Sequence, residues 1–329
     1  KELIVAVLQQ KYKVLFTQGN LNNHIGAPLT LLGLTREHEL AVVEMGANHP
    51  GEIRTLVNIV EPDCGLITNV GKAHLEGFGS FEGVVKTKGE LYDFLRSKVN
   101  AFAFLDKDND VLCQTSAGLK TIPYGMEGNA DLYVSGKLRA CAPFLAFEWK
   151  YEGMTYEVQT HLIGAYNIKN ALAAIALGCH FGVPAADICA ALSQYIPSNN
   201  RSQLTETADN HLIVDAYNAN PTSMAAALDN LSSTVAERKV AMLGDMLELG
   251  EDSLKLHSEV VERLSAMNLS LVCLVGGEFS KVCEGNEAVH CFATSDELAG
   301  WLADNPVDGA TVLVKGSRGT RMEKVIPAL

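Results

Sequence analysis

Two lysines, Lys86 and Lys88, lie two positions apart in the segment EGVVKTKGEL, residues 82–91. If this segment is helical, side chains two residues apart point in different directions, so each lysine needs its own explanation. Lys86 has an acid four positions away on either side, Glu82 and Glu90, and forms a polar stripe with them. We therefore expect Lys86 to be an ordinary charge on the helix surface.

Lys88 shares helical spacing with Val84, Leu91 and Leu95, which predicts a position on the apolar face. A lysine on an inward face must extend to the surface, find a partner or change its charge state. If CO₂ adds to the Lys88 amine, the resulting carbamate is an anion that can bind Mg²⁺ through oxygen. The buried group would then carry a negative charge that a bound cation neutralises.

An acid and a histidine in the same half of the chain are candidate metal ligands. Glu44 lies in the apolar stretch VVEMGA, where a carboxylate is costly to bury unless a cation or hydrogen bonds compensate it. His74 follows the strand-like segment CGLITNVG, in a loop. Carboxylate and imidazole both bind metals. The residue types leave two alternatives open, namely a buried carboxylate satisfied by backbone donors and an exposed loop histidine.

Side-chain amides cluster before two expected helices. Asn20, Asn22 and Asn23 precede the first, and Asn167 and Asn170 lie three apart at the start of another. Asparagines in such places can cap the helix. Three of them exceed what one cap requires, so the first cluster could bind a polar ligand, and the second could contact the edge of a base.

Polar residues also follow three strand-like segments in the last third of the chain. They occur in VDAYNANPTSM, MLGDMLELGED and VLVKGSRGTRME, and the last segment is a plausible anion site. Each segment alone could be turn chemistry. Together with the amide-rich segments of the first half, they line the same kind of strand edge in both domains, which suggests an active site between the two domains. The candidates are Asp215, Tyr217, Asn218, Asn220, Asp245, Lys315, Ser317 and Arg318.

The elements that must position these residues alternate between strand and helix. In the first half, strands are expected at 13–19, 40–47, 64–71 and 101–106, with helices near 26–34, 51–60 and 81–96. This alternation predicts an α/β fold with a mostly parallel sheet. Residues 120–163 alternate apolar and polar side chains, which predicts a small antiparallel β addition. A helical pair follows, with Pro184 at the start of the second helix.

The polar segment PSNNRSQ marks the expected domain boundary, giving domains 1–198 and 199–329. Beyond it the alternation resumes, which predicts a second, smaller, Rossmann-like α/β domain. Its expected strands are HLIVDAY, KVAMLGD, SLVCLVGG and ATVLVKG, and its expected helices lie near 222–233, 253–267, 295–304 and 321–327.

Composition limits the class of protein. The 329 residues carry a formal net charge of −13 without a basic run, which argues against nucleic-acid binding. No apolar run approaches the roughly 20 residues of a membrane span, and no signal peptide is visible. The eight cysteines are scattered and are expected to be reduced residues of a cytoplasmic protein. The chain opens directly on an amphipathic helix, so we expect that its true start is missing.

Several of these segments, taken in order, resemble the Mur ligases, the ATP-dependent amide ligases that build the peptidoglycan stem peptide. The resemblance spans essentially the whole chain, and its motifs are GNLNNHIGAPLTLL, EMGANHPGEI, NVGKAHLEGFGS, KGEL, DAYNANPTSM, GDMLELGE and VKGSRGTRME. Within the family, the chain is similar to the members that add D-alanyl-D-alanine to UDP-N-acetylmuramoyl-tripeptide. The resemblance implies an acyl-phosphate mechanism with ATP and Mg²⁺ as cofactors, and we expect a monomer.

The resemblance also implies roles for the matching positions. Glu44 and His74 would be Mg²⁺ ligands and Lys88 the carbamylated lysine, since the motif is Lys-Gly-Glu followed by an aliphatic residue; Lys315 would act with them in catalysis. The segment that contacts adenine matches Asn167 and Asn170, and the nucleotide would also contact Arg201 and Asp215. The UDP-sugar peptide would contact Asn20, Asn22, Asn23 and Asn48. The reaction centre and the incoming dipeptide would face Tyr217, Asn218, Asn220, Asp245, Ser317 and Arg318.

Two departures from the family pattern matter. Tyr166 stands where the family usually has a histidine, before the first asparagine of the adenine segment. The phosphate-binding loop ending in Gly-Lys-Thr and the N-terminal domain do not occur, and no substitute G-x-x-x-x-G-K-[ST] is present. We therefore expect this chain alone to bind ATP weakly and not to turn over. The alternatives are a non-catalytic nucleotide- or peptide-binding module and a metal-dependent hydrolase with a carbamylated lysine.

Overall fold

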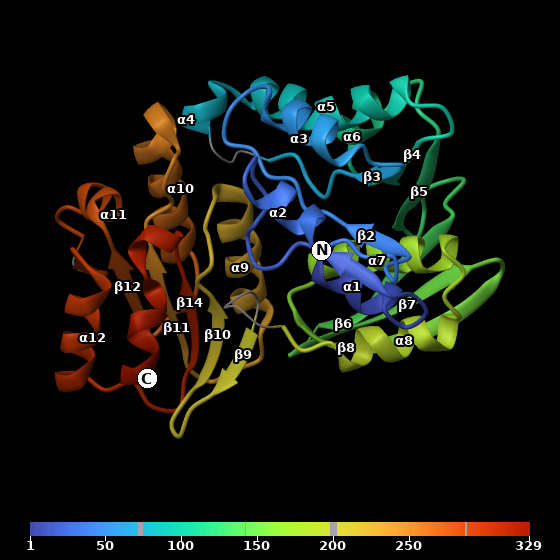
Figure 1. Ribbon diagram of the computed structural model, residues 1–329. Helices are drawn as coiled ribbons and strands as arrows, with labels where there is room; N and C mark the ends of the chain where they lie inside the picture. The colour runs from blue at the N-terminus through green and yellow to red at the C-terminus, as the bar shows by residue number, and fades with distance from the viewer. Residues whose placement is uncertain (72–74, 142, 198–202, 287) are drawn as a thin grey trace.

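The chain folds into two lobes, each formed by a continuous part of the sequence (Figure 1). The computed structural model describes residues 1–71, 75–141, 143–197, 203–286 and 288–329. In Figure 1 the blue-to-green part of the chain forms one lobe, and the yellow-to-red part forms the other. The predicted boundary at 198/199 falls outside the described residues, so the division by residue number stays a prediction.

The first lobe contains a mixed sheet with strand order β3-β4-β5-β6-β7-β8. Strands β3 to β6 are parallel, and β6, β7 and β8 pair antiparallel. The predicted antiparallel addition is therefore present, and β5 joins it to the parallel strands. A two-stranded parallel sheet of β1 and β2 packs against the same core. The bounds are β1 Val14–Phe16, β2 Leu40–Val42, β3 Cys64–Leu66, β4 Phe102–Asp106, β5 Thr121–Met126, β6 Val134–Cys141, β7 Phe144–Tyr151 and β8 Met154–Ile163.

Helices cover both faces of this lobe. One core cluster joins α1, α7 and α8 to the sheet, and a second joins α3, α5 and α6 to it. The predicted helical pair corresponds to α7 and α8, and the expected N-terminal helix corresponds to α1. The bounds are α1 Glu2–Leu8, α2 Gly26–Leu32, α3 Glu52–Val60, α4 Leu75–Phe78, α5 Phe81–Ser97, α6 Asp110–Thr115, α7 Asn167–His180 and α8 Ala185–Gln194.

The second lobe contains a sheet with strand order β13-β12-β11-β14-β10-β9, in which β9 alone is antiparallel among the described strands. The predicted second α/β domain is confirmed. The expected helix near 321–327 is a 3₁₀ segment, η3, which contains Pro327. The bounds are β9 Gln203–Glu206, β10 His211–Asp215, α9 Pro221–Ser233, β11 Lys239–Gly244, η1 Gly250–Asp252, α10 Ser253–Ser265, β12 Leu271–Val275, α11 Gly277–Val282, β13 His290–Phe292, α12 Ser295–Asp304, β14 Thr311–Lys315, η2 Arg318–Thr320 and η3 Met322–Ala328.

The two lobes contact each other in two places. Ile163, at the end of β8, is buried in the core cluster of the second lobe, and Phe144 packs against that cluster. Nearer the site, the backbone N–H of Glu76 donates to the carbonyl of Glu248 at 3.4 Å. Gly250 has a φ of +61° and lies against Glu76, a conformation that favours glycine at this contact. The lobes therefore hold a shared cavity from both sides.

The described residues show neither disulfides nor a membrane span. All eight cysteines belong to the described part of the chain and are free thiols, and Cys291 is exposed. In that same part, the helices are too short or too polar to cross a bilayer.

Candidate functional site

A cavity of about 820 Å³ between the two lobes is the candidate site. Loops at the ends of β1 and β2 line it from the first lobe, and loops after β10, β11 and β14 line it from the second. The structure thus places nine of the predicted site residues around one cavity between the two lobes. They are Asn20, Asn22, Asn23, Glu44, Asn48, Tyr217, Asn218, Ser317 and Arg318.

The cavity also contains polar residues that the sequence analysis did not single out. His24, His49, Glu52 and Glu248 line it, and all four are ionisable. Glu52 accepts hydrogen bonds from the backbone N–H groups of Asn48 at 2.7 Å and His49 at 3.0 Å. An acid that follows a turn and precedes an apolar helical run is a signal for such a cap. Glu52 therefore fixes the turn that presents Asn48.

The carboxylate of Glu44 is held by donors from two other segments. Its Oε1 accepts a hydrogen bond from Asn22 Nδ2 at 2.9 Å, and its Oε2 lies 3.6 Å from Lys1 Nζ. The backbone N–H of Glu44 donates to Thr17 Oγ1 at 2.9 Å. Because the carboxylate meets side-chain donors at a cavity wall, the alternative of a core carboxylate satisfied by backbone donors is not observed.

Gly46 explains part of the EMGANHP motif. Its backbone N–H donates to the Asn22 carbonyl at 2.8 Å. A Cβ atom at Gly46 would lie 2.8 Å from Asn22 Nδ2, which is closer than a real Cβ contact. Glycine therefore allows Asn22 to approach both Gly46 and the carboxylate of Glu44.

Helix α5 separates the two lysines as the spacing predicts. Lys86 is exposed, whereas Lys88 is half-buried near Val84 and Leu91, which are buried. Lys88 Nζ donates to the carbonyl of Asn69 at 2.7 Å, and burial lowers the pKa of Lys88. A lowered pKa raises the fraction of neutral amine at a given pH, and the neutral amine is the form that reacts with CO₂.

The prediction that Glu90 belongs to the exposed stripe of Lys86 is wrong. Glu90 is only 6% exposed, and one of its carboxylate oxygens accepts a hydrogen bond from the backbone N–H of Arg54 at 2.8 Å. The other oxygen lies 3.4 Å from the Arg54 guanidinium. Helix α3 follows Gly51, which supplies no side-chain cap. Glu90 on α5 therefore satisfies an N-terminal N–H group of α3.

The predicted metal ligands fit a magnesium site in part. Glu44 offers a half-buried carboxylate at the cavity, the kind of oxygen ligand that Mg²⁺ prefers. Lys88 could be a ligand only as a carbamate, and its lowered pKa suits that reaction. His74 lies outside the described residues. No group of three His, Cys, Asp or Glu side chains with metal-site geometry occurs among the residues that the structure describes.

The predicted nucleotide residues that the structure describes, Asn167, Asn170 and Asp215, do not line the cavity. Asn167, at the start of α7, is buried and donates from Nδ2 to the Ile163 carbonyl at 2.8 Å. Asn170 Nδ2 donates to Asn167 Oδ1 at 2.9 Å, so the two amides form one chain of hydrogen bonds. This arrangement gives Asn167 a structural function and leaves base contact a prediction for Asn170. Arg201 lies outside the described residues.

Lys315 is the most deeply buried of the predicted catalytic groups within the described part of the chain. It is 1% exposed, and its Nζ lies 2.5 Å from Asp215 Oδ2 and 3.1 Å from the Asn218 carbonyl. These contacts join the ends of the adjacent strands β10 and β14. Lys315 therefore supports the segment that carries Tyr217 and Asn218 into the cavity.

Two predicted dipeptide-facing residues act within the second lobe instead of lining the cavity. Asn220 caps α9, where its side chain accepts from the Ser223 N–H and the Ser223 hydroxyl accepts in return. Asp245 is buried and accepts hydrogen bonds from the Glu278 and Phe279 N–H groups at the start of α11, at 3.0 and 2.9 Å. In this arrangement both side chains direct their hydrogen bonds away from the cavity.

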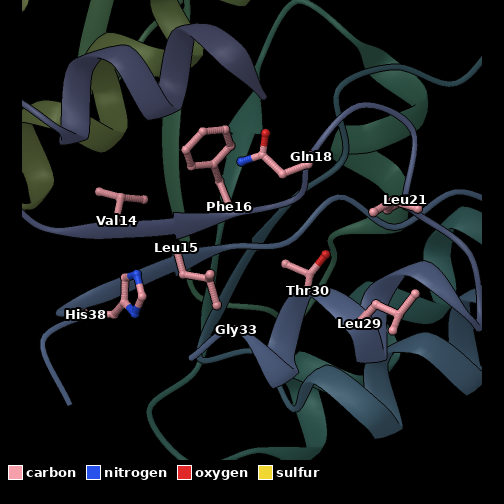
Figure 2. A pocket seen from close by; sticks show the side chains of 9 residues that line it. All are labelled: Val14, Leu15, Phe16, Gln18, Leu21, Leu29, Thr30, Gly33 and His38. Atoms are coloured by element: carbon pink, nitrogen blue, oxygen red, sulfur yellow. The ribbon is translucent and has the colours of Figure 1, made fainter. Parts of the chain in front are cut away.

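A second, smaller pocket of about 360 Å³ lies between β1 and α2 (Figure 2). Its lining is mostly apolar, with Gln18, Thr30 and His38 as polar members. Thr30 Oγ1 donates to the Gly26 carbonyl, and the His38 ring contacts Thr35, so both already have partners. The pocket lacks the convergent polar groups that orient a ligand, and none of the predicted site residues lines it.

Comparison with known proteins follows the same division of the chain. The Mur ligase middle domain model matches residues 1–178, and the model described as Mur ligase, glutamate ligase domain matches residues 200–318. The chain is 37% identical over 340 residues to UDP-N-acetylmuramoyl-tripeptide–D-alanyl-D-alanine ligase of Haemophilus influenzae, covering 100% of this chain and 73% of that protein. It is 36% identical to the enzyme of the same name from Escherichia coli, covering 100% and 74%.

Solved structures give the same result. MurF from Acinetobacter baumannii superposes with a TM-score of 0.89 at 30% identity, over 99% of this chain and 72% of that one. MurF ligase from Thermotoga maritima in complex with ADP superposes with a TM-score of 0.88 at 28% identity, over 100% and 75%.

Proposed function

Because the chain belongs to the Mur ligase family, we propose that it catalyses the ATP-dependent joining of D-alanyl-D-alanine to UDP-N-acetylmuramoyl-tripeptide in peptidoglycan synthesis. The observation that carries this proposal is the cavity in which motif residues of both lobes meet. The alternatives, a binding module and a metal-dependent hydrolase, have no comparable support.

The reaction requires two substrates to meet in a shielded space. ATP transfers its γ-phosphoryl group to the terminal carboxylate of the tripeptide, which gives an acyl phosphate and ADP. The free amine of the dipeptide attacks the acyl carbon, loses a proton and expels phosphate. Most of the rate enhancement in such chemistry comes from positioning and charge stabilisation. The cavity suits this because its amides can bind the peptide while Arg318 supplies a positive charge.

ATP is the energy source in this proposal. A relative of known structure binds ADP, which supports a nucleotide site in this fold. We assign contacts with the nucleotide to Asn170, Arg201 and Asp215, and give Asn167 the role of orienting Asn170. One chain supplies both walls of the cavity, so a monomer suffices, and the substrates are those of a cytoplasmic enzyme.

We assign Mg²⁺ binding to Glu44, His74 and carbamylated Lys88. When bound, Mg²⁺ neutralises charge on the transferring phosphoryl group. The carbamate forms when the neutral Lys88 amine attacks CO₂ and releases one proton. Burial favours the neutral amine, and the Asn69 carbonyl orients the nitrogen.

Because this chain alone is expected not to turn over, the test is run on the chain joined to a Mur ligase phosphate-binding loop and N-terminal domain. It is a coupled assay for ADP and phosphate release with UDP-N-acetylmuramoyl-tripeptide, ATP and Mg²⁺, with and without D-alanyl-D-alanine. We expect sustained release only with the dipeptide, together with a pentapeptide product detected by mass spectrometry. Hydroxylamine should trap the acyl phosphate when the dipeptide is omitted. Sustained ATP hydrolysis without the dipeptide, or hydrolysis of the tripeptide substrate, would refute the ligase assignment.

A further inference from the structure

Lys1 makes contacts that its place in helix α1 does not explain. Its Nζ donates to the carbonyls of Thr17 at 2.6 Å and Gly19 at 2.9 Å, and its side chain is only 7% exposed. The same nitrogen lies 3.6 Å from Glu44 Oε2. One buried ammonium group thus connects α1, the segment after β1 and the carboxylate beyond β2.

The same nitrogen also lies 3.1 Å from Glu2 Oε1, an acid in the first turn of α1. The Lys1 side chain therefore joins an acid of α1 to the backbone of the segment after β1 and to the carboxylate of Glu44.

We propose that Lys1 is a positioning residue for the ligase reaction, which orders the segment 17–23 and holds the carboxylate of Glu44 in place. This inference rests on the proposed function. Lys1 and Asn22 approach the two oxygens of Glu44 from different sides, so the carboxylate is oriented before any ligand arrives. The carbonyls of Thr17 and Gly19 fix the backbone that leads into Asn20, Asn22 and Asn23. A preorganised ligand loses less freedom when it binds a cation.

The chain offers a matched control in Lys11. Its Nζ also donates to two backbone carbonyls, those of Phe181 at 3.2 Å and Gly182 at 3.0 Å. Lys11 lies in the turn after α1, and neither carbonyl belongs to the cavity. Lys11→Met therefore removes the same kind of interaction without touching the site.

The experiment compares Lys1→Met, Lys1→Arg and Lys11→Met by two measurements. The first is hydrogen–deuterium exchange of residues 17–23 without Mg²⁺ or nucleotide. The second is the Mg²⁺ concentration that gives half-maximal phosphate release by the chain joined to a Mur ligase phosphate-binding loop and N-terminal domain. For Lys1→Met we expect exchange about tenfold faster, since charged hydrogen bonds are lost, and a half-saturating Mg²⁺ concentration about tenfold higher. Lys1→Arg should restore most of both, and Lys11→Met should change neither.

Unchanged exchange in residues 17–23 and an unchanged Mg²⁺ requirement in Lys1→Met would refute the proposal. If Lys1→Met slowed turnover while both measurements kept their wild-type values, the role would also be refuted, because the slower turnover would then arise neither from the order of segment 17–23 nor from Mg²⁺ binding. Failure of the proposed function looks different. No variant would then release phosphate, yet the exchange measurement would still decide whether Lys1 orders the segment.

Discussion

The two walls of the cavity have the same kind of framework but use their polar side chains differently. On both, polar residues follow the carboxyl ends of parallel strands. On the first-lobe wall Asn20 and Asn23 lie at exposed positions, although Asn23 Oδ1 accepts hydrogen bonds from the Ile25 and Gly26 N–H groups at 3.1 and 2.9 Å. On the second-lobe wall, Lys315 and Asp245 are buried and already bound to neighbouring segments. The first wall offers groups to a ligand, whereas much of the second wall uses its polar groups to hold itself together.

This difference explains which predicted residues line the cavity. The second wall presents mainly Tyr217, Asn218 and Arg318, and the buried Lys315 behind them donates to the Asn218 carbonyl at 3.1 Å. On the first wall, Lys1 and Glu90 hold the backbone of neighbouring segments through hydrogen bonds to Thr17 and Arg54. We therefore expect substitutions on the first wall to affect chemistry and ligand binding, and substitutions behind the second wall to affect stability.

The largest expected effect tests the chemistry assigned to the first wall. Lys88→Ala removes the amine that would form the carbamate, so we expect ligase turnover to fall about a thousandfold or more, the scale of losing a preorganised charge contact. Added bicarbonate should not restore it. The measurement is phosphate release with both substrates at saturation, by the chain joined to a Mur ligase phosphate-binding loop and N-terminal domain. Lys86→Ala is the control, because Lys86 is exposed two positions away, and it should be nearly silent. Equal losses in the two variants would contradict the assignment of Lys88.

The next effect tests whether the second wall is mainly structural. Lys315→Met leaves the Asp215 carboxylate without its ammonium partner in a buried setting, which should lower the free energy of unfolding by about 3 kcal/mol. Urea denaturation monitored by circular dichroism would measure it. Lys324→Met is the matched control, since Lys324 pairs with Asp296 at the surface, and it should leave the unfolding midpoint unchanged. If Lys315→Met unfolds like the wild type, the pair does not hold strands β10 and β14 together.

A smaller effect is expected behind the first wall, at Glu90. Glu90→Ala removes the acceptor for the Arg54 N–H group, and losing a helix cap costs about 1 kcal/mol. Because α3 follows the turn that presents Asn48, the KM for the tripeptide substrate should rise more than kcat falls. Glu90→Gln keeps an acceptor and should recover most of both properties. Glu82 is an exposed acid on the same helix, so Glu82→Ala should change neither the stability nor the KM for the tripeptide substrate. A change in kcat alone would contradict the proposal that Glu90 holds the turn that presents Asn48.

Much of the fold follows from the sequence because apolar runs and their spacing mark buried elements. The predicted strands exist, but they are shorter than the apolar runs. The run 40–47 contributes a strand only over Leu40–Val42, because residues 43–47 leave the strand and turn into the cavity wall. The strands β9 and β13 were not predicted. Segments such as QLTE and HCF have no apolar pattern, and they become strands only by pairing with β10 and β12.

The sequence predicts the residue types of the site, but it does not predict the side chains that hold those residues in position. Helical spacing placed Lys88 correctly because α5 itself decides that orientation. The same spacing misplaced Glu90, because α3 packs over the turn of α5 that would otherwise face solvent. Lys1 and Lys315 depend on partners far away in the sequence, so no local pattern indicates them. Asp245 was selected for its strand-end position, and only the fold shows that α11 uses its carboxylate.

The smallest expected effect tests the outer edge of the second wall, at Glu278. Its carboxylate accepts hydrogen bonds from Lys281 at 2.6 Å and from Ser253 at 2.7 Å, and these lower the pKa of Glu278. A lowered carboxyl pKa stabilises the fold above the unfolded value and loses that contribution as pH falls through the folded value. Since water screens this partly exposed group, Glu278→Gln should cost only about 0.5 kcal/mol at pH 7. Urea unfolding from pH 7 down to pH 3 should show the difference from wild type shrinking with acidity. A difference that stays constant to pH 3 would mean that shape, and not charge, sets the role of Glu278. The buried network around Asp245 would then hold the second wall without help from ion pairs at its edge.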